Sequence, residues 1–322
     1  MKWQQSRNPS IHLGNLFTMK LAWTGVFPAL TTPFHPDDKL DLELFITNLE
    51  AQQQAGVNGV IIGGSLGEAS SLETAEKKVL VQLAVKKFGE RLPVILNIAE
   101  GSTREAIHHA RLAQEWGAIG LMLLPPMRYK ADDHETVTFF KAVAASTLLP
   151  IMIYNNPIDY KIEVTLDMFE ELADCSNIQA VKESTRDISN VTRMLSRFGE
   201  RFKILCGVDT IAMEELLMGA HGWVAGLVDA FPRETVAIYR LIKAGRVGEA
   251  KKIQNWFLPL LELDIHPKLV QYIKLASAQT GIGSEYVRAP RLTLTGSERE
   301  RVLQIIQKGI SQRPGLPDYL NL

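Results

Sequence analysis

Two short apolar runs in the sequence each end in a polar side chain that can do chemistry. The run over 151–154 ends at Tyr154, and the run over 180–182 ends at Lys182. One helix-length segment separates the two runs, which predicts neighbouring strands of a parallel sheet. A lysine that ends a buried strand is costly unless it acts, because burial disfavours its charged form. A neutral amine there could attack a carbonyl group, and a tyrosine beside it could move protons.

Each of these residues also has a plainer interpretation. Lys182 can end a strand with its ammonium group reaching solvent and paired with a glutamate. Tyr154 can be a core tyrosine whose hydroxyl bonds to the backbone. Spacing alone leaves both interpretations open, because a perturbed lysine does not always mark function and tyrosine carries protons less often than histidine.

Strands and helices are expected to alternate along most of the chain, at intervals of roughly 25–30 residues. Near-continuous apolar strands are typical of a parallel sheet covered on both faces. No G-x-G-x-x-G turn follows the first strand, so a closed (β/α)8 TIM barrel of the α/β class is favoured over an open doubly wound sheet. The expected strands are 24–30, 59–62, 94–97, 120–124, 151–154, 178–182, 202–206 and 222–225.

In such a barrel the functional side chains gather at the carboxyl ends of the strands. The glycine-rich turn over 63–67 offers N–H groups and a hydroxyl, which suits a carboxylate or a phosphate. A plain tight turn needs the same glycines, and spacing alone favours that simpler interpretation. Glu68 is expected to be a charge at a helix N-terminus rather than a catalytic acid. The candidates at the strand ends are Ser65, Leu66, Glu68, Pro125, Pro126, Tyr154, Asn155, Asn156, Lys182, Glu183, Ser184, Gly207, Asp209 and Val224.

Composition excludes several classes of function. The 322 residues are 46% hydrophobic and 22% charged, with a net charge of −1 and no basic run, so neither nucleic acid nor an anionic membrane is an expected partner. The cysteines and histidines lack metal-ligand spacing, so no metal is expected. No window approaches the roughly 20 apolar residues of a transmembrane helix. A cytoplasmic location is predicted.

The expected organisation has three parts. Residues 1–19 lack the apolar core of a signal peptide and are interpreted as a disordered leader or a misplaced start. Residues 20–245 should form the barrel. From residue 246 the alternation stops, and 246–322 should form a block of helices packed on the barrel.

Several of these motifs together resemble one known family. The segments 64–68, 154–157 and 181–184 read Gly-Ser-Leu-Gly-Glu, Tyr-Asn-Asn-Pro and Val-Lys-Glu-Ser. This set resembles the dihydrodipicolinate synthase / N-acetylneuraminate lyase family of class I aldolases, over nearly the whole chain from about Trp23. The resemblance implies a TIM barrel, usually a homotetramer built as a dimer of dimers. It also implies a covalent Schiff base on a lysine, with no dissociable cofactor.

The resemblance also implies roles for individual residues. Lys182 would be the Schiff-base lysine and Tyr154 the tyrosine that shuttles protons. Ser65 and the Leu66 N–H would hold the carboxylate of a 2-oxo acid, with the Val224 backbone nearby. Asn156 and Asp209 are candidates at the rim for assisting the departure of a hydroxyl group.

Three departures from the synthases point away from their reaction. Ser65-Leu66 stands where they carry two threonines, and Met127 lies near the position of a tyrosine that they donate across a dimer. Asp159 stands where their arginine grips the carboxylate of the second substrate. An acid there would repel that carboxylate, so dihydrodipicolinate synthesis is not the expected activity.

Longer stretches over 154–161, 263–271 and 288–292 are similar to 1-pyrroline-4-hydroxy-2-carboxylate deaminases of hydroxyproline catabolism. The resemblance therefore implies a small 2-oxo or cyclic-imine carboxylate as substrate, with 2,5-dioxopentanoate and ammonia as products. One alternative is an aldolase or dehydratase acting on a 2-keto-3-deoxy sugar acid. Synthase-like condensation is another. A non-enzymatic ligand-binding regulator fits least, because a binding protein has no use for a reactive amine.

Overall fold

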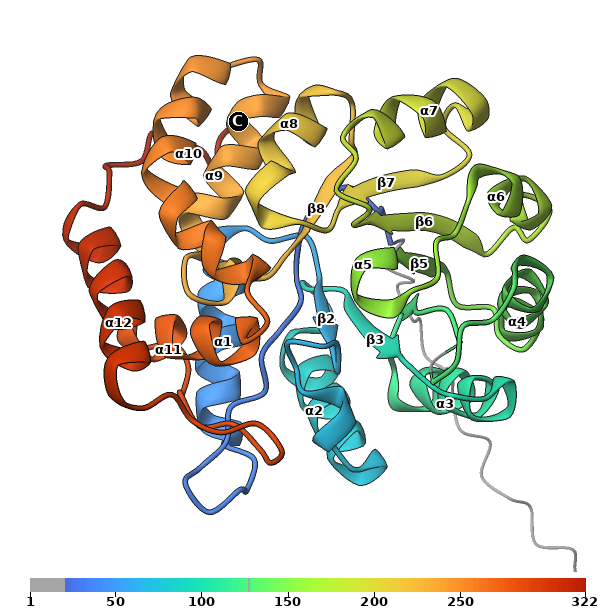
Figure 1. Ribbon diagram of the computed structural model, residues 1–322, viewed down its shortest axis with the longest axis horizontal. Helices are drawn as coiled ribbons and strands as arrows, with labels where there is room; N and C mark the ends of the chain where they lie inside the picture. The colour runs from blue at the N-terminus through green and yellow to red at the C-terminus, as the bar shows by residue number, and fades with distance from the viewer. Residues whose placement is uncertain (1–20, 127) are drawn as a thin grey trace, which may run out of the picture.

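A computed structural model describes residues 21–126 and 128–322, and eight parallel strands form its centre (Figure 1). The expectations for the leader and for Met127 fall outside the described residues. Each strand lies close to a run expected from the sequence. The strands are β1 (Gly25–Pro28), β2 (Val60–Ile62), β3 (Val94–Ile98), β4 (Gly120–Leu123), β5 (Ile151–Asn155), β6 (Ile178–Glu183), β7 (Lys203–Cys206) and β8 (Gly222–Ala225).

The strands close into a barrel. Their order is β1-β8-β7-β6-β5-β4-β3-β2, and a bridge between Ala29 and Ile61 joins the two ends. The Leu30 N–H completes this junction with a 2.9 Å hydrogen bond to the Ile61 carbonyl. The (β/α)8 TIM barrel expected from the sequence is therefore confirmed.

Helices follow the strands and form an outer ring, which explains why the strands are apolar at nearly every position (Figure 1). Local signals set the helix ends. Asp41 caps α1 by accepting a hydrogen bond from the Leu44 N–H, and Gly56 ends the helix in a left-handed conformation. The ring contains α1 (Leu42–Ala55), α2 (Thr74–Phe88), α3 (Thr103–Trp116), α4 (Asp133–Ala145), α6 (Leu166–Leu172), α7 (Ser189–Phe198), α8 (Ala212–Leu217) and α9 (Pro232–Lys243).

One helix in the barrel loops was not expected. The helix α5 (Pro157–Tyr160) is a single turn directly after β5. Asn156 caps it by accepting a hydrogen bond from the Asp159 N–H at 3.1 Å, and proline occupies its first position. The turn is too short for a helical apolar pattern to reveal it.

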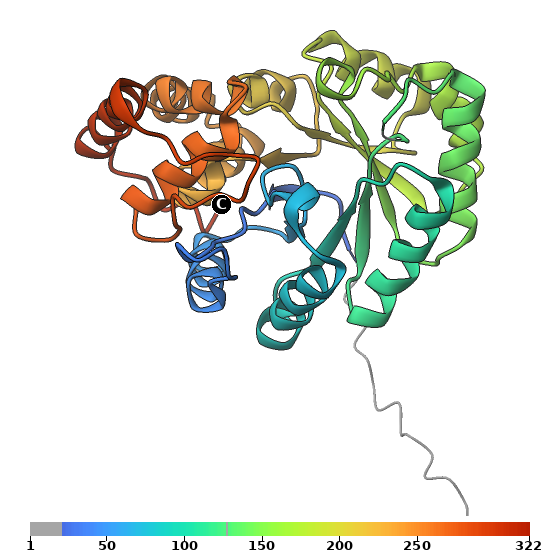
Figure 2. The ribbon, with the colours of Figure 1, turned by 60° about the horizontal axis from the view of Figure 1, so that its bottom comes forward.

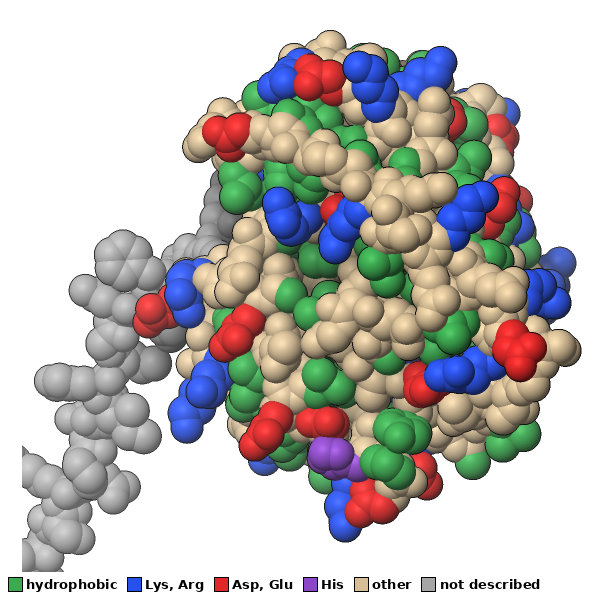
Figure 3. Space-filling model, turned by 90° about the vertical axis from the view of Figure 1, so that its left-hand side faces the viewer, with side chains coloured by type: hydrophobic (Ala, Val, Ile, Leu, Met, Phe, Trp, Pro, Cys, Tyr) green, Lys and Arg blue, Asp and Glu red, His purple; other side chains and the backbone are tan. Residues whose placement is uncertain are grey.

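The C-terminal part of the chain is helical. It contains α10 (Val247–Leu261), the 3-10 turn η4 (Glu262–Ile265), α11 (Leu269–Gln279) and α12 (Gly296–Ser311), which pack beside α1 and α9 (Figure 2). The face that these helices present carries acidic and basic side chains interspersed (Figure 3). Within 21–126 and 128–322, no helix is long and apolar enough to cross a membrane.

Candidate active site

Tyr154 and Lys182 are brought together on adjacent strands. They are paired in register on β5 and β6, and the Lys182 Nζ lies 4.1 Å from the centroid of the Tyr154 ring. Both side chains are buried, at 8% and 7% exposure. Burial lowers the pKa of the Lys182 amine and outweighs the opposing effect of nearby acidic groups. A buried amine with a lowered pKa is available as a nucleophile.

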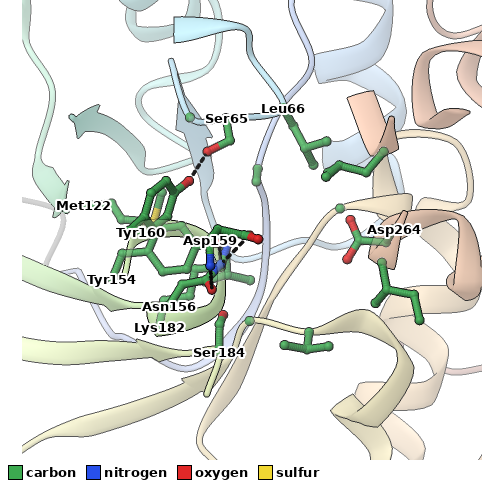
Figure 4. Close-up of a pocket in the computed structure, with 18 of the residues that line it drawn as sticks. Ser65, Leu66, Met122, Tyr154, Asn156, Asp159, Tyr160, Lys182, Ser184 and Asp264 are labelled. Atoms are coloured by element: carbon green, nitrogen blue, oxygen red, sulfur yellow. Dashed lines mark hydrogen bonds between the residues drawn. The ribbon is translucent and has the colours of Figure 1, made fainter. Parts of the chain in front are cut away.

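Asn156 links the tyrosine hydroxyl to a carboxylate. Its Nδ2 donates to the Tyr154 hydroxyl at 3.1 Å and to Asp159 Oδ2 at 2.8 Å (Figure 4). Burial raises the pKa of the Tyr154 hydroxyl, and the Asn156 hydrogen bond opposes this effect. The predicted site residue Asn156 therefore lies in the pocket, where it orients both partners.

A second tyrosine, which the sequence reasoning missed, joins Ser65 to this group. The Tyr160 hydroxyl lies 2.5 Å from Ser65 Oγ, and its ring packs edge-on against Tyr154 at a centroid distance of 5.5 Å. Burial raises the pKa of the Tyr160 hydroxyl. Tyr160 falls within the segment 154–161, which contributes to the family resemblance. Only the turn of α5, however, directs its hydroxyl to the loop after β2.

The loop after β2 carries Ser65 and Leu66 into the pocket, and the C-terminal helices hold it in place. Glu68, which follows in a left-handed conformation, is fully buried and pairs with Lys274 Nζ of α11 at 2.7 Å. Its other oxygen accepts the Arg288 N–H at 3.0 Å. Glu68 does stand at a helix N-terminus, as the N-cap of the 3-10 turn η1 (Ala69–Ser71), but its side chain makes no cap hydrogen bond and instead ties the loop to α11.

The ends of β7 and β8 contribute differently. Val224 lines the pocket, whereas Asp209 is not among the lining residues. The Asp209 carboxylate accepts hydrogen bonds from Trp223 Nε1 at 2.9 Å, from the Leu227 N–H at 2.7 Å and from the Gly226 N–H. The buried Asp209 carboxylate therefore holds the turn after β8.

A carboxylate from the C-terminal helices also lines the pocket. Asp264 lies in η4 and faces the cavity from the side opposite Lys182 and the tyrosines (Figure 4). The sequence reasoning noted its segment but assigned it no role. Ser184 and Arg186, from the loop after β6, line the pocket as well. In the part of the chain that the structure describes, no group of three or more His, Cys, Asp or Glu side chains could hold a metal ion.

A (β/α)8 barrel with a desolvated lysine beside a tyrosine at its strand ends has the architecture of a Schiff-base-forming lyase. Residues 22–309 match the dihydrodipicolinate synthetase family, and the chain belongs to that family. It is 32% identical over 273 residues to the 4-hydroxy-tetrahydrodipicolinate synthase of Exiguobacterium sibiricum, covering 84% of this chain and 91% of that protein. Members of the family form a covalent Schiff base on a lysine and use no metal cofactor.

Solved structures agree with this assignment. The 4-hydroxy-tetrahydrodipicolinate synthase of Methylacidiphilum fumariolicum SolV is 27% identical, with a TM-score of 0.85 and coverage of 89% of this chain and 96% of that chain. A dihydrodipicolinate synthase variant described as monomeric shares the fold at 23% identity, with a TM-score of 0.83 over 90% of this chain and 97% of that chain. The fold by itself therefore does not decide the assembly.

Proposed function

We propose that the protein holds a small 2-oxo or cyclic-imine carboxylate as a Schiff base on Lys182 and removes water and ammonia from it. The proposed substrate is 1-pyrroline-4-hydroxy-2-carboxylate, and the products are 2,5-dioxopentanoate and ammonia. The observation that carries the proposal is the pair of acids, Asp159 and Asp264, that line the pocket with Lys182. The Asp159 carboxylate repels a second carboxylate, and both acids can form hydrogen bonds with an amine or a hydroxyl group.

Binding and ring opening come first. The Ser65 hydroxyl and the Leu66 N–H would hold the substrate carboxylate, with the Val224 backbone alongside. The neutral Lys182 amine attacks C2 of the ring, and the bond from C2 to the ring nitrogen breaks. Lys182 Nζ is then doubly bonded to C2, and the former ring nitrogen becomes an amine on C5.

Proton transfer and elimination follow. The Schiff base withdraws electrons from C3, so a C3 proton becomes acidic, and Tyr154 relays that proton. The C4 hydroxyl leaves as water, and a C3–C4 double bond forms. This double bond migrates toward C5 and produces an imine there. Hydrolysis of the C5 imine releases ammonia, and hydrolysis at C2 frees Lys182, so one water molecule is consumed overall.

Synthase-like condensation is the second candidate. The relatives' names favour it, and Arg186 lines the pocket, where a guanidinium group would attract a second carboxylate. An aldolase or dehydratase acting on a 2-keto-3-deoxy sugar acid would use the same lysine. These activities differ in the distal half of the substrate and not in the Schiff-base chemistry.

One panel of substrates separates the candidates. The purified protein is incubated with 1-pyrroline-4-hydroxy-2-carboxylate, with a 2-keto-3-deoxy sugar acid, and with pyruvate plus aspartate 4-semialdehyde. We expect release of ammonia and 2,5-dioxopentanoate from the first substrate. Pyruvate release from the sugar acid, or condensation in the third mixture, without ammonia release from the first would overturn the proposal.

The assembly and the location are also proposals. The family resemblance supports a homotetramer built as a dimer of dimers, and sedimentation of the full chain tests it. The Ser65–Tyr160 contact lies within one chain, so it requires no neighbouring subunit. The cytoplasmic location stays a prediction, which fractionation of cells would test.

A further inference from the structure

Asp264 reaches the barrel pocket from outside the barrel. It lies in η4, the short turn between α10 and α11, and lines the same pocket as Lys182 and Ser65. Figure 4 shows its carboxylate directed into the cavity, across from Tyr154 and Lys182. The helices after residue 246 therefore supply part of the pocket wall as well as packing against the barrel.

The path of Asp264 into the pocket depends on a glycine. Asp264 Oδ1 lies 2.4 Å from the position that a Cβ atom would take on Gly226, directly after β8. Any other side chain at position 226 would displace the carboxylate. The Gly226–Leu227 turn is held from below by Asp209, whose oxygens accept both backbone N–H groups. The backbone at Gly226, which Asp209 holds, therefore lies against the Asp264 carboxylate and limits where that carboxylate can sit.

The surroundings favour the protonated form of Asp264. Asp264 is half-buried, and its removal from bulk water in the pocket raises its pKa well above the usual range. The negative charges of Asp209 and Asp159 act in the same direction. Lys182 opposes the shift but does not cancel it. A carboxyl group that keeps its proton can donate it to a leaving group.

We propose that Asp264 is the general acid that protonates the C4 hydroxyl as it leaves the Schiff-base intermediate. This inference rests on the proposed function and assigns a residue to its dehydration step. The C4–O bond breaks, the electron pair from the C3 carbanion forms the C3–C4 double bond, and the Asp264 proton joins the departing hydroxyl to give water. Asp264 regains a proton from the water molecule that later attacks C5.

Two variants test the inference, and a borohydride assay accompanies them. Asp264→Asn keeps the shape of the side chain but has no acidic proton. Glu262→Gln changes an exposed acid in the same turn and is the matched control. Schiff-base formation is measured separately by trapping pyruvate on the protein with borohydride, because pyruvate carries no leaving hydroxyl.

We expect Asp264→Asn to slow ammonia release about 10²–10⁴-fold, the usual range for a lost acid–base group, while pyruvate trapping stays normal. Glu262→Gln should match the wild type in both assays. If Asp264→Asn releases ammonia within threefold of the wild-type rate, or loses trapping and turnover equally, the acid role is overturned. If the wild-type protein releases no ammonia from the pyrroline substrate, the proposed function fails and this inference fails with it.

Discussion

The Lys182 Nζ lies 4.1 Å from the centroid of the Tyr154 ring, because the two residues are paired in register at the ends of β6 and β5. The tyrosine covers one side of the amine and helps to exclude water from it. Its hydroxyl is held by Asn156 at the same strand end. The nucleophile and the proton carrier of the proposed reaction are therefore positioned by a single pair of strands.

Borohydride should attach pyruvate to Lys182 and not to Lys243. Both amines have pKa values lowered by burial, but Lys243 donates to the Ala220 carbonyl away from the pocket. Peptide mass analysis identifies the labelled residue. The Lys182→Ala variant should be neither labelled nor active, and Lys243→Ala should behave like the wild type. Label that persists in Lys182→Ala would remove Lys182 from the mechanism.

The trapping rate should fall as the pH falls. Only the neutral amine attacks a carbonyl, and the Lys182 pKa lies below its ordinary value of 10.5. The rate should therefore decline as the pH drops through that lowered pKa. It is measured with pyruvate at a series of pH values. A rate that rises toward acid pH would contradict the neutral-amine mechanism.

Removing the Tyr154 hydroxyl should cost far more than removing the Tyr160 hydroxyl. Tyr154→Phe deletes the proposed proton carrier, so kcat should fall about 10²–10⁴-fold. Tyr160→Phe deletes the hydrogen bond to Ser65, worth about 1 kcal/mol, so kcat/KM should fall about fivefold. Steady-state kinetics of the two variants make a matched comparison. Equal losses of activity in the two variants would mean that Tyr154 is not the proton carrier.

Breaking the buried pair of Glu68 and Lys274 should destabilise the protein strongly. Lys274→Met removes the nearer of two cations from the fully buried Glu68 and leaves only Arg291 at 3.8 Å, and breaking such a buried pair typically costs about 3–5 kcal/mol. Adding Glu68→Gln should recover part of this loss, because no buried charge then remains unpaired. The exposed Lys268, which pairs with Glu298, provides the control, and Lys268→Met should change stability by about 1 kcal/mol or less. Denaturant unfolding measures the stability of Lys274→Met, of the double variant and of Lys268→Met. Equal losses of stability in Lys274→Met and Lys268→Met would show that the buried pair contributes no more than the exposed one.

Glu215 should make stability fall as the pH rises. It is buried on α8 with no hydrogen-bond partner for either carboxylate oxygen in the described structure, and burial raises its pKa from 4.5 to about 8. Between these two values the unfolded chain releases a proton that the folded chain retains, so stability declines across that window. Glu215→Gln should remove this decline and stabilise the protein at pH 8 by about 4 kcal/mol.

Thermal or denaturant unfolding from pH 5 to pH 8 measures the effect. Glu214→Gln is the matched control, because Glu214 is the exposed neighbour on the same helix. An unchanged slope of stability against pH in Glu215→Gln would show that Glu215 does not titrate as described.

The sequence by itself determined the barrel and its strand ends. Apolar runs alternating with helical segments predict parallel strands, and parallel strands bring their carboxyl ends to one face. Periodicity therefore places Lys182, Tyr154 and the Ser65 loop at that face. The pattern is readable because burial on both faces demands apolar residues throughout a strand, so a polar residue at its end stands out.

Only the tertiary structure decided which distant segments meet at that face. Glu68 and Lys274 are 206 positions apart, and Tyr160 lies 95 positions from Ser65. Asp264 comes from outside the alternating part of the chain, and its entry depends on the missing side chain at Gly226. Periodicity reports which face of an element is buried but not which other element covers it, so such contacts emerge only once the chain has packed.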